Sequence, residues 1–436
     1  MEEVYNSIKL GYSLLPMITD ILYRCPSCGG FDWMEGGRCI HCGAAIQEIS
    51  RTEVSVDSRR DTIGHWYCRV LDFDLPPARD GLIMRSGPVS LSREAAAGVY
   101  RGFAGVKATR YARAACDEGA ISLNAQGLVF AGQSRRLELP LGDLLGLTIE
   151  SNTIILTSRA HGILFFDFRS ESGKKWEDCI RKALSSFHAP RTIHEFYPRI
   201  RFLDQLRERP ARARGHLDLK VPTEVQRRKE SARLLRTART LAGPAVRALF
   251  SVSVSGLENI PKTGAAVLMP NHSSFLDSIV LGALPGRNIW FMAKNSEYRN
   301  SLITWALRQA RSFPVRRYAV DVQAVRNAIR IVQQGHILGI FPEGERTWDN
   351  TMLPFRSGTM RLVLALGKPV IPVGIAGSYE LMPRWTSSIR RSRMNIRIGA
   401  PVVLDHVPIP RQTRTDILEV ERIIQTHIRN LSGENH

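Results

Sequence analysis

The sequence predicts a multidomain protein that combines α+β and α/β units. At 436 residues the chain is longer than one typical domain. Two CxxC pairs lie close together near the N-terminus. A series of short strand patterns ending in a helix occupies the middle, and strand and helix patterns alternate in the C-terminal part. The expected boundaries are 20–48, 60–188, 189–250 and 251–430.

The composition indicates an anionic partner and an intracellular setting. Lys and Arg number 60 against 41 Asp and Glu, a net charge of +19, which favours a membrane face, a nucleic acid or an acidic cofactor. The start, Met1-Glu-Glu-Val4, lacks the positive region of a secretory signal. No uncharged apolar run reaches about 18 residues, so we expect no transmembrane helix. A lipid substrate would then require a protein that binds the membrane surface.

The cysteine spacing predicts a metal site. Two CxxC pairs separated by ten residues can place four thiolates tetrahedrally around Zn²⁺, and metal binding would supply the folding energy of so small a segment. The odd total of seven cysteines, without a signal peptide, argues against a disulfide framework. The alternative is a redox pair or four free thiols. We predict a structural zinc ribbon over 20–48, without His41 as a ligand. The expected ligands are Cys25, Cys28, Cys39 and Cys42.

The second unit, 60–188, has the pattern of a small antiparallel β domain closed by a helix. The helix is expected over Glu171–Ser185, with Trp176, Ile180 and Leu184 on one face. This pattern resembles the PH/GRAM-like superfold, a β-barrel with a C-terminal helix. The resemblance implies a docking module for lipid or protein, and the alternative is an adaptor with no ligand of its own. The predicted strands are Ala120–Leu123, Gly127–Ala131, Arg135–Leu139, Leu145–Glu150, Thr153–Thr157 and Gly162–Phe168.

The connector, 189–250, is strongly basic. From Arg191 to Arg247 it holds 15 Lys/Arg against 6 Asp/Glu, a net charge of +9. An apolar stripe from Leu234 to Phe250 predicts an amphipathic helix, which Pro244 should kink. Such a helix suits the headgroup layer of an anionic leaflet. The alternative is a solvated linker followed by a helix that packs on the next domain.

The third unit, 251–430, alternates apolar strand patterns with helical ones, which predicts an α/β sandwich. The strands are expected at Ala265–Met269, Ile289–Ala293, His336–Phe341, Val370–Ile375 and Met394–Ile398. The helices are expected near Phe275–Leu284, Ser301–Arg311, Asp321–Gln334 and Gly358–Leu366.

One His and one Asp in this unit suggest general-base chemistry. On a single helix, His272 and Asp277 would point about 140° apart. They can meet if His272 lies in the loop before a helix that Ser274 caps. A carboxylate on one imidazole nitrogen fixes the tautomer and leaves the other nitrogen as a base. The alternative is that Ser274 and Asp277 form a capping box and nothing more.

Three further segments follow this pair in order. The four segments are Asn271-His272-x4-Asp277, Phe313-Pro-Val-Arg316, Phe341-Pro-Glu343-Gly344 and Val370-Ile-Pro-Val373. Together they resemble the motifs of the glycerophospholipid acyltransferase family, whose best-known members are the 1-acylglycerol-3-phosphate acyltransferases. The similarity covers less than half of the chain and includes the lead-in Gly256-Leu-Glu-Asn-Ile-Pro261.

The resemblance implies a role for each matching residue. His272 would deprotonate the acceptor hydroxyl, which attacks an acyl thioester, and Asp277 would orient His272. Neither a Ser or Cys nucleophile nor a catalytic metal is needed. The family commonly has Thr where this chain has Glu345, and a negative charge there is unfavourable unless it points away or pairs with an arginine. The residues expected to hold the glycerol-phosphate portion of the acceptor are Arg316, Glu343, Gly344, Arg346 and Lys294.

The resemblance therefore implies an acyltransferase that moves a fatty acyl group from acyl-CoA or acyl-carrier protein to a lysophospholipid. We expect it to lie on the cytoplasmic face of an anionic membrane, with the ribbon or the PH-like domain available to a protein partner. The second hypothesis is a catalytically silent lipid-binding or tethering protein. The third is nucleic-acid binding, which is disfavoured because the basic residues crowd the connector, and only Arg24 and Arg38 flank the cysteine pairs.

Overall fold

The chain divides into two compact units. The first comprises Met1–Ala95 and Ala112–His216, and the second comprises Ala96–Tyr111 and Leu217–His436. Most of the predicted connector, including its amphipathic helix, lies outside the described residues. No helix within the described part of the chain is both long and apolar enough to cross a bilayer. The computed structural model describes residues 21–31, 34–35, 37–49, 53–150, 152–189, 193–195, 201–202, 251–284, 287–318, 321–384, 389–390 and 392–433.

In the first unit, the cysteine-rich segment continues into a small sheet and a helix that the sequence patterns did not reveal. Helix α3 buries Trp66, whose indole Nε1 donates a hydrogen bond to the Val54 carbonyl 3.0 Å away. Short charged strands such as Arg59–Thr62 carry little apolar pattern, which is why they were missed. The elements are β1 (Met34–Glu35), β2 (Arg38–Cys39), β3 (Ile46–Glu48), β4 (Glu53–Val56), β5 (Arg59–Thr62) and α3 (Ile63–Asp72).

The middle of the first unit is an antiparallel sheet covered by helix α4 (Gly173–Phe187). Its strand order is β10-β9-β8-β7-β13-β12-β11, with β6 on β8. The strands at the two ends of this order, β10 and β11, contribute side chains to the same hydrophobic core as α4, so the sheet is curled. Trp176, Ile180 and Leu184 of α4 are fully buried there, as predicted. A PH-like barrel stays a prediction. The strands are β6 (Leu82–Arg85), β7 (Val89–Arg101), β8 (Lys107–Asn124), β9 (Gly127–Gly132), β10 (Arg136–Pro140), β11 (Leu144–Glu150), β12 (Thr153–Ser158) and β13 (Gly162–Phe168).

The long β7–β8 hairpin departs most from the predicted strands. The strand expected at 120–123 is the end of an 18-residue strand, and β7 was not predicted. Both contain runs of alanine and charged residues without apolar alternation. The tip of the hairpin, residues 96–111, belongs to the second unit.

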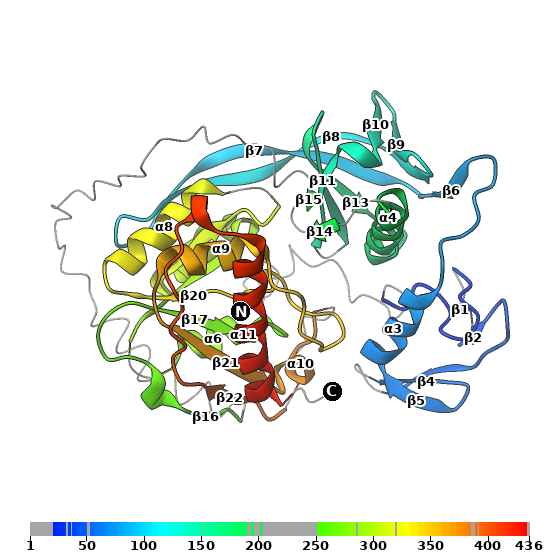
Figure 1. The fold of residues 1–436 in the computed structure, drawn as a ribbon. Helices are drawn as coiled ribbons and strands as arrows, with labels where there is room; N and C mark the ends of the chain where they lie inside the picture. Colours follow the sequence, from blue (N-terminus) through cyan, green and yellow to red (C-terminus); the bar gives the residue numbers. More distant parts are fainter. Residues whose placement is uncertain are drawn as a thin grey trace. The chain divides into compact units, whose positions relative to one another are not determined.

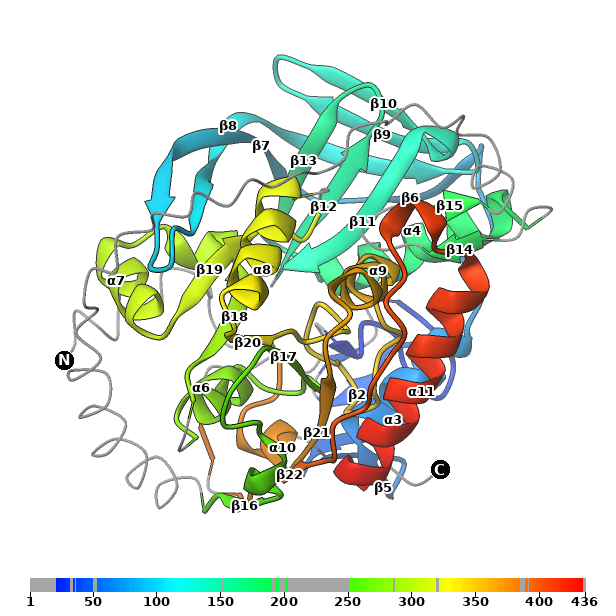
Figure 2. The same cartoon turned by 60° about the vertical axis from the view of Figure 1, so that its left-hand side comes forward.

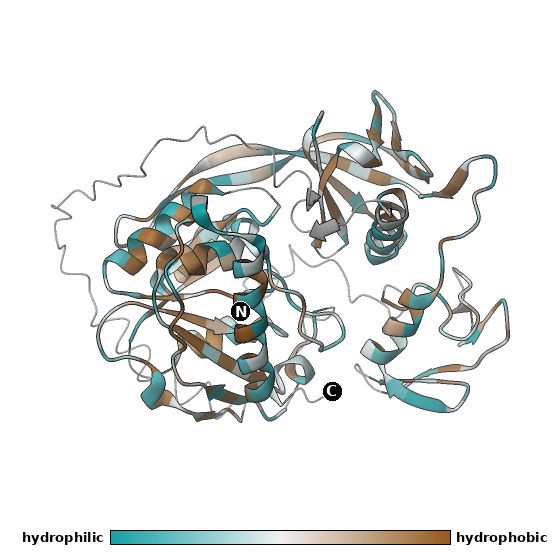
Figure 3. Cartoon of the chain, in the orientation of Figure 1, coloured by the Kyte–Doolittle hydropathy of each residue, from teal (hydrophilic) through white to brown (hydrophobic). Residues whose placement is uncertain are grey.

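The second unit contains a seven-stranded mixed sheet, so the predicted α/β sandwich is confirmed. The strand order is β16-β22-β21-β17-β20-β18-β19. The five strands from β21 to β19 are parallel, whereas β22 is antiparallel to β21. Figure 3 shows that the central strands are largely hydrophobic, as expected of strands covered on both faces. The strands are β16 (Ser253–Ser255), β17 (Ala266–Pro270), β18 (Ile289–Lys294), β19 (Ser312–Val315), β20 (Ile337–Gly339), β21 (Val370–Ala376) and β22 (Asn395–Ile398).

Helices cover both faces of this sheet (Figure 1). One face shares a core with α8, α9 and α11, and the other shares a core with α6. Helix α11 was not predicted. It begins with a capping box in which Thr413 and Asp416 satisfy each other's backbone N–H. The helices are α6 (Leu276–Gly282), α7 (Ser301–Gln309), α8 (Val322–Gln333), α9 (Ser357–Leu366), α10 (Ser378–Leu381) and α11 (Arg414–Ser432).

Candidate functional site

The predicted site residues gather at one edge of the second sheet. Because β17, β18, β19 and β20 are parallel, their carboxyl ends meet at the same edge, where open α/β sheets usually bind ligands. His272 follows β17, Lys294 ends β18, Arg316 follows β19, and the segment that begins at Phe341 follows β20. The topology thus brings Lys294 and three of the four motifs to one edge, while the fourth motif, Val370–Val373, lies within β21 and pairs with β17.

His272 and Asp277 form the pair that the sequence predicted. His272 Nδ1 lies 2.9 Å from Asp277 Oδ2. The same oxygen accepts the backbone N–H groups of Ser273 at 2.9 Å and Ser274 at 2.8 Å. Asp277 is fully buried. Because an ionised carboxylate only accepts, Nδ1 must carry the imidazole proton, and Nε2 is left with the lone pair that a base requires.

The helix begins later than predicted. Helix α6 starts at Leu276 with Phe275 at the N-cap position. Ser274, the expected cap, accepts the Leu276 N–H on its Oγ at 3.3 Å and donates its hydroxyl to the Met382 carbonyl at 3.1 Å. Asp277 turns towards the loop that holds His272. Asp277 accepts the Ser274 N–H, as in half of a capping box, and the same oxygen also holds His272, which lies in the loop as expected.

The loop after β20 holds His272 from several sides. The backbone N–H of His272 donates to Glu343 Oε1 at 2.7 Å, and its carbonyl accepts the N–H of Thr347 at 3.0 Å. The ring of Phe341 stacks on the imidazole, with centroids 3.9 Å apart. Backbone and ring are thus fixed together, which is the preorganisation that a general base needs.

Glu343 has a structural role that the sequence did not suggest. Its second oxygen, Oε2, accepts the N–H of Leu353 at 2.9 Å, and the side chain is only 3% exposed. Both carboxylate oxygens therefore bind backbone amides. Gly344 has φ +74°, and a Cβ there would collide with the Arg356 side chain, whose Nε donates to the Glu343 carbonyl. Glycine is thus required for this turn.

Glu345, the unusual acidic residue, is neutralised within the protein. Its carboxylate lies 2.7 Å from Arg384 Nη1 and 3.5 Å from Arg356 Nη2. Arg384 Nη1 also donates to the Arg346 carbonyl at 2.7 Å. The negative charge is therefore paired with these two arginines, and the same contact supports the backbone at Arg346.

The electrostatic surroundings keep His272 neutral. Burial lowers the pKa of His272 from its ordinary 6.5, while the hydrogen bond and the charge of Asp277 act in the opposite direction. The positive charges of Arg346 and Arg317 lower the pKa further. An imidazole with a lowered pKa is unprotonated near neutral pH, which is the form that accepts a proton.

Arg317 is a site residue that the sequence analysis missed. Its charge acts on His272, whereas the predicted Arg316 places its guanidinium 4.3 Å from the centre of the Tyr111 ring. The sequence shows an arginine doublet and gives no means of choosing between its members.

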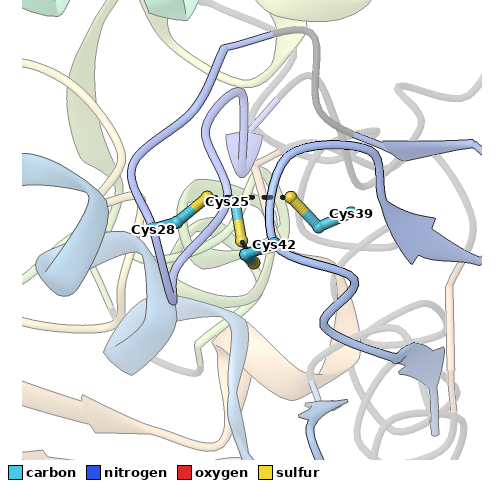
Figure 4. A group of neighbouring side chains, drawn as sticks. All are labelled: Cys25, Cys28, Cys39 and Cys42. Carbon is cyan, nitrogen blue, oxygen red and sulfur yellow. Dashed lines mark hydrogen bonds between the residues drawn. The ribbon is translucent and has the colours of Figure 1, made fainter.

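The four cysteines of the first unit converge as predicted (Figure 4). All four sulfurs lie within 4.8 Å of one another. Zn–S bonds of about 2.3 Å place sulfurs about 3.8 Å apart in a tetrahedron, and the Cys25–Cys42 and Cys28–Cys39 sulfur distances are 3.8 and 3.7 Å. His41 Nε2 lies 2.8 Å from the Phe31 carbonyl, in agreement with its exclusion from the ligand set. The cluster can hold a tetrahedral metal ion.

Comparison with known proteins points to one family. Residues 251–376 match the family model described as Acyltransferase. A chloroplastic 1-acyl-sn-glycerol-3-phosphate acyltransferase of Brassica napus is 28% identical over 175 residues, covering 39% of this chain and 49% of that protein. The 1-acyl-sn-glycerol-3-phosphate acyltransferase of Bacillus subtilis is 28% identical over 166 residues, covering 37% of this chain and 80% of that protein.

A solved structure is also similar. The 1-acyl-sn-glycerophosphate (LPA) acyltransferase PlsC from Thermotoga maritima is 28% identical, with a TM-score of 0.40, and the match covers 48% of this chain and 84% of that one. The chain spans about half the length of the Brassica napus relative. The site around His272 lies within the matched residues, and 251–376 form an acyltransferase domain.

Proposed function

We propose that the protein transfers a fatty acyl group from acyl-CoA or acyl-carrier protein to the free hydroxyl of a lysophospholipid such as 1-acylglycerol-3-phosphate. The observation that carries the proposal is the buried His272–Asp277 pair, 2.9 Å apart, inside an acyltransferase domain. The curated relatives named above are 1-acyl-sn-glycerol-3-phosphate acyltransferases.

The geometry supports a direct transfer. His272 Nε2 takes the proton of the acceptor hydroxyl as its oxygen attacks the carbonyl carbon of the thioester. The C–S bond then breaks, the thiolate leaves, and the imidazolium returns the proton to it. Asp277 fixes the tautomer and stabilises the positive charge that forms on the ring.

The acceptor phosphate is proposed to bind beside His272. Arg346 and Arg317 are the arginines whose charges act on that residue, and guanidinium groups suit phosphate oxygens. Arg316 and Lys294 add positive charge at the same sheet edge. Gly344 shapes the loop that carries Arg346, and Glu343 contributes by holding the His272 backbone rather than through a free carboxylate.

We also propose that the protein binds the cytoplasmic face of an anionic membrane. Within the described residues, helix α7 buries none of its side chains, and Leu302 and Trp305 are 58% and 55% exposed one turn apart. The helix begins at the carboxyl edge that carries His272, and the exposed Arg299 precedes it. Apolar side chains with a Trp and flanking basic charge are typical of interfacial helices.

The proposed metal of the cysteine cluster is a structural Zn²⁺. Four sulfur ligands leave no open position for substrate, which is the property of structural rather than catalytic zinc sites. Bound zinc would tie together the two CxxC turns of a segment that has little core of its own.

The first prediction tests the reaction. With radiolabelled acyl-CoA and a panel of lysophospholipids, the His272→Ala variant should lose at least about 100-fold in rate, because no base remains, yet should bind vesicles normally. His427→Ala, an exposed histidine of α11, is the matched control. Retained turnover in His272→Ala would refute the general-base assignment. No product from the wild type, with acyl-carrier-protein donors also tried, would favour the silent lipid-binding alternative.

The second prediction concerns pH. Since the pKa of His272 is lowered from 6.5 and the neutral ring is active, kcat/KM should fall only as pH drops below about 6.5. Arg346→Ala removes a charge that lowers this pKa, so its acid limb should move to higher pH. Arg422→Ala, an exposed arginine of α11, should leave the limb in place. The same acceptor is used throughout. If the acid limb of the kcat/KM profile does not move in Arg346→Ala, the Arg346 charge does not lower the pKa of His272 as proposed.

The third prediction tests the membrane surface. A double variant, Leu302→Ser with Trp305→Ser, should cosediment less with vesicles of phosphatidylcholine and phosphatidylglycerol, because it loses apolar contact with the bilayer. Val403→Ser, which removes an 82% exposed apolar side chain elsewhere, is the control. Charge reversal within Arg227–Arg239 should weaken binding in a salt-dependent way. Unchanged binding of the double variant would exclude α7 from the interface.

The fourth prediction concerns the metal. Purified protein should contain about one zinc ion per chain, and Cys28→Ser should lose it together with thermal stability. Cys68→Ser, an exposed cysteine outside the cluster, should retain the ion. Atomic emission and thermal unfolding with and without a chelator measure both effects. Absence of zinc from the wild type, with no effect of added zinc on its unfolding, would refute the site.

A further inference from the structure

The tip of the β7–β8 hairpin is built into the unit that carries the acyltransferase domain. Tyr100, Val106 and Ala108 are at most 6% exposed and join the core formed by the central sheet and α8. None of these residues lies within 251–376, the matched part of the chain. A distant segment of sequence therefore completes the domain.

The tip of the hairpin lies near α8 (Figure 2), and its contacts with that helix include hydrogen bonds as well as apolar packing. Asn327 of α8 is fully buried, and its Nδ2 donates to the Lys107 carbonyl at 2.8 Å while its Oδ1 accepts the Lys107 N–H at 3.4 Å. Arg330 Nη1 donates to the Gly105 carbonyl at 2.8 Å. A buried amide without hydrogen-bond partners is energetically costly. The hairpin backbone therefore supplies hydrogen-bond partners that the buried Asn327 side chain needs.

The hairpin also reaches the strand that leads to the arginine doublet. Tyr100 Oη donates to the carbonyl of Ser312, the first residue of β19, at 2.7 Å. The buried Asn295 donates its Nδ2 to the Tyr111 carbonyl at 3.2 Å. The Tyr111 ring lies against the Arg316 guanidinium, 4.3 Å from ring centre to Cζ. The backbone carbonyl of Tyr111 therefore contacts Asn295, and its ring contacts Arg316, both at the carboxyl edge of the sheet.

The two arginines of the doublet have different surroundings. Arg316 is fixed through its guanidinium on Tyr111 and through its backbone N–H, which donates to Asp321 Oδ2 at 3.0 Å. Arg317, the next residue, exerts its charge on His272. Because the two residues are adjacent, fixing the side chain and the backbone N–H of Arg316 restrains the backbone from which the Arg317 side chain leaves.

We infer that Tyr111 is a positioning residue for the acyltransferase site: by stacking on Arg316, it holds Arg317 where it can bind the acceptor phosphate. The inference rests on the proposed function. A guanidinium over an aromatic face is attractive, and the attraction needs the ring rather than the tyrosine hydroxyl. Phenylalanine at this position should therefore substitute for tyrosine, whereas an aliphatic side chain should not.

The test is steady-state acyl transfer by the full chain from acyl-CoA to 1-acylglycerol-3-phosphate and to monoacylglycerol, which lacks the phosphate. Tyr111→Leu should raise KM for the phosphate-bearing acceptor roughly three- to tenfold, with little change in kcat and little effect on monoacylglycerol. Tyr111→Phe should behave as wild type. Arg317→Ala should raise the same KM, and adding Tyr111→Leu to it should have little further effect. Val99→Ala, an exposed hairpin residue, is the control.

The outcomes separate the two proposals. A wild type that transfers no acyl group refutes the proposed function and this inference with it. An active wild type that is sensitive to Arg317→Ala but not to Tyr111→Leu overturns the inference alone. Equal loss with both acceptors, or a Tyr111→Phe variant as impaired as Tyr111→Leu, indicates a general structural role and also overturns it.

Discussion

The candidate site depends on one set of hydrogen bonds, those that fix the His272 backbone to the loop after β20. Glu343 accepts the His272 N–H, and Thr347 donates to its carbonyl. These hydrogen bonds connect the segments that follow β17 and β20, two neighbouring parallel strands. Asp277 and Phe341 can then hold the imidazole ring itself. The buried Glu343 carboxylate is tolerated because both of its oxygens accept backbone N–H groups, as buried polar groups require.

The sequence could predict those parts of this arrangement that follow from periodicity and spacing. Alternating apolar runs located the central strands, and the distance between His272 and Asp277 required the loop that the structure shows. The role of Glu343 could not be foreseen, because its partners are backbone amides and sequence carries no signal for them. The same holds for the pairing of Glu345 with Arg384, a residue distant in sequence.

The β7–β8 hairpin shows the same limit on a larger scale. Apolar alternation is confined to the start of β7 and the end of β8, and the residues between are rich in alanine and charge. The few apolar residues at the tip are buried in the core of the second unit. The local sequence pattern cannot reveal a contact with residues so distant in sequence. Domain boundaries read from sequence assume that each unit is continuous, and here 96–111 belongs with residues more than a hundred positions later.

The charges around His272 explain why one carboxylate and two arginines are placed beside a buried imidazole. Burial alone would weaken the base by lowering its pKa, and Asp277 offsets part of that loss. Arg317 and Arg346 weaken the base further, which would be a disadvantage if they had no other role. Under the proposed function they attract an acceptor whose phosphate neutralises them. Occupation of the site would then remove the two charges that oppose protonation, so the base would be strongest when the hydroxyl it must deprotonate is bound.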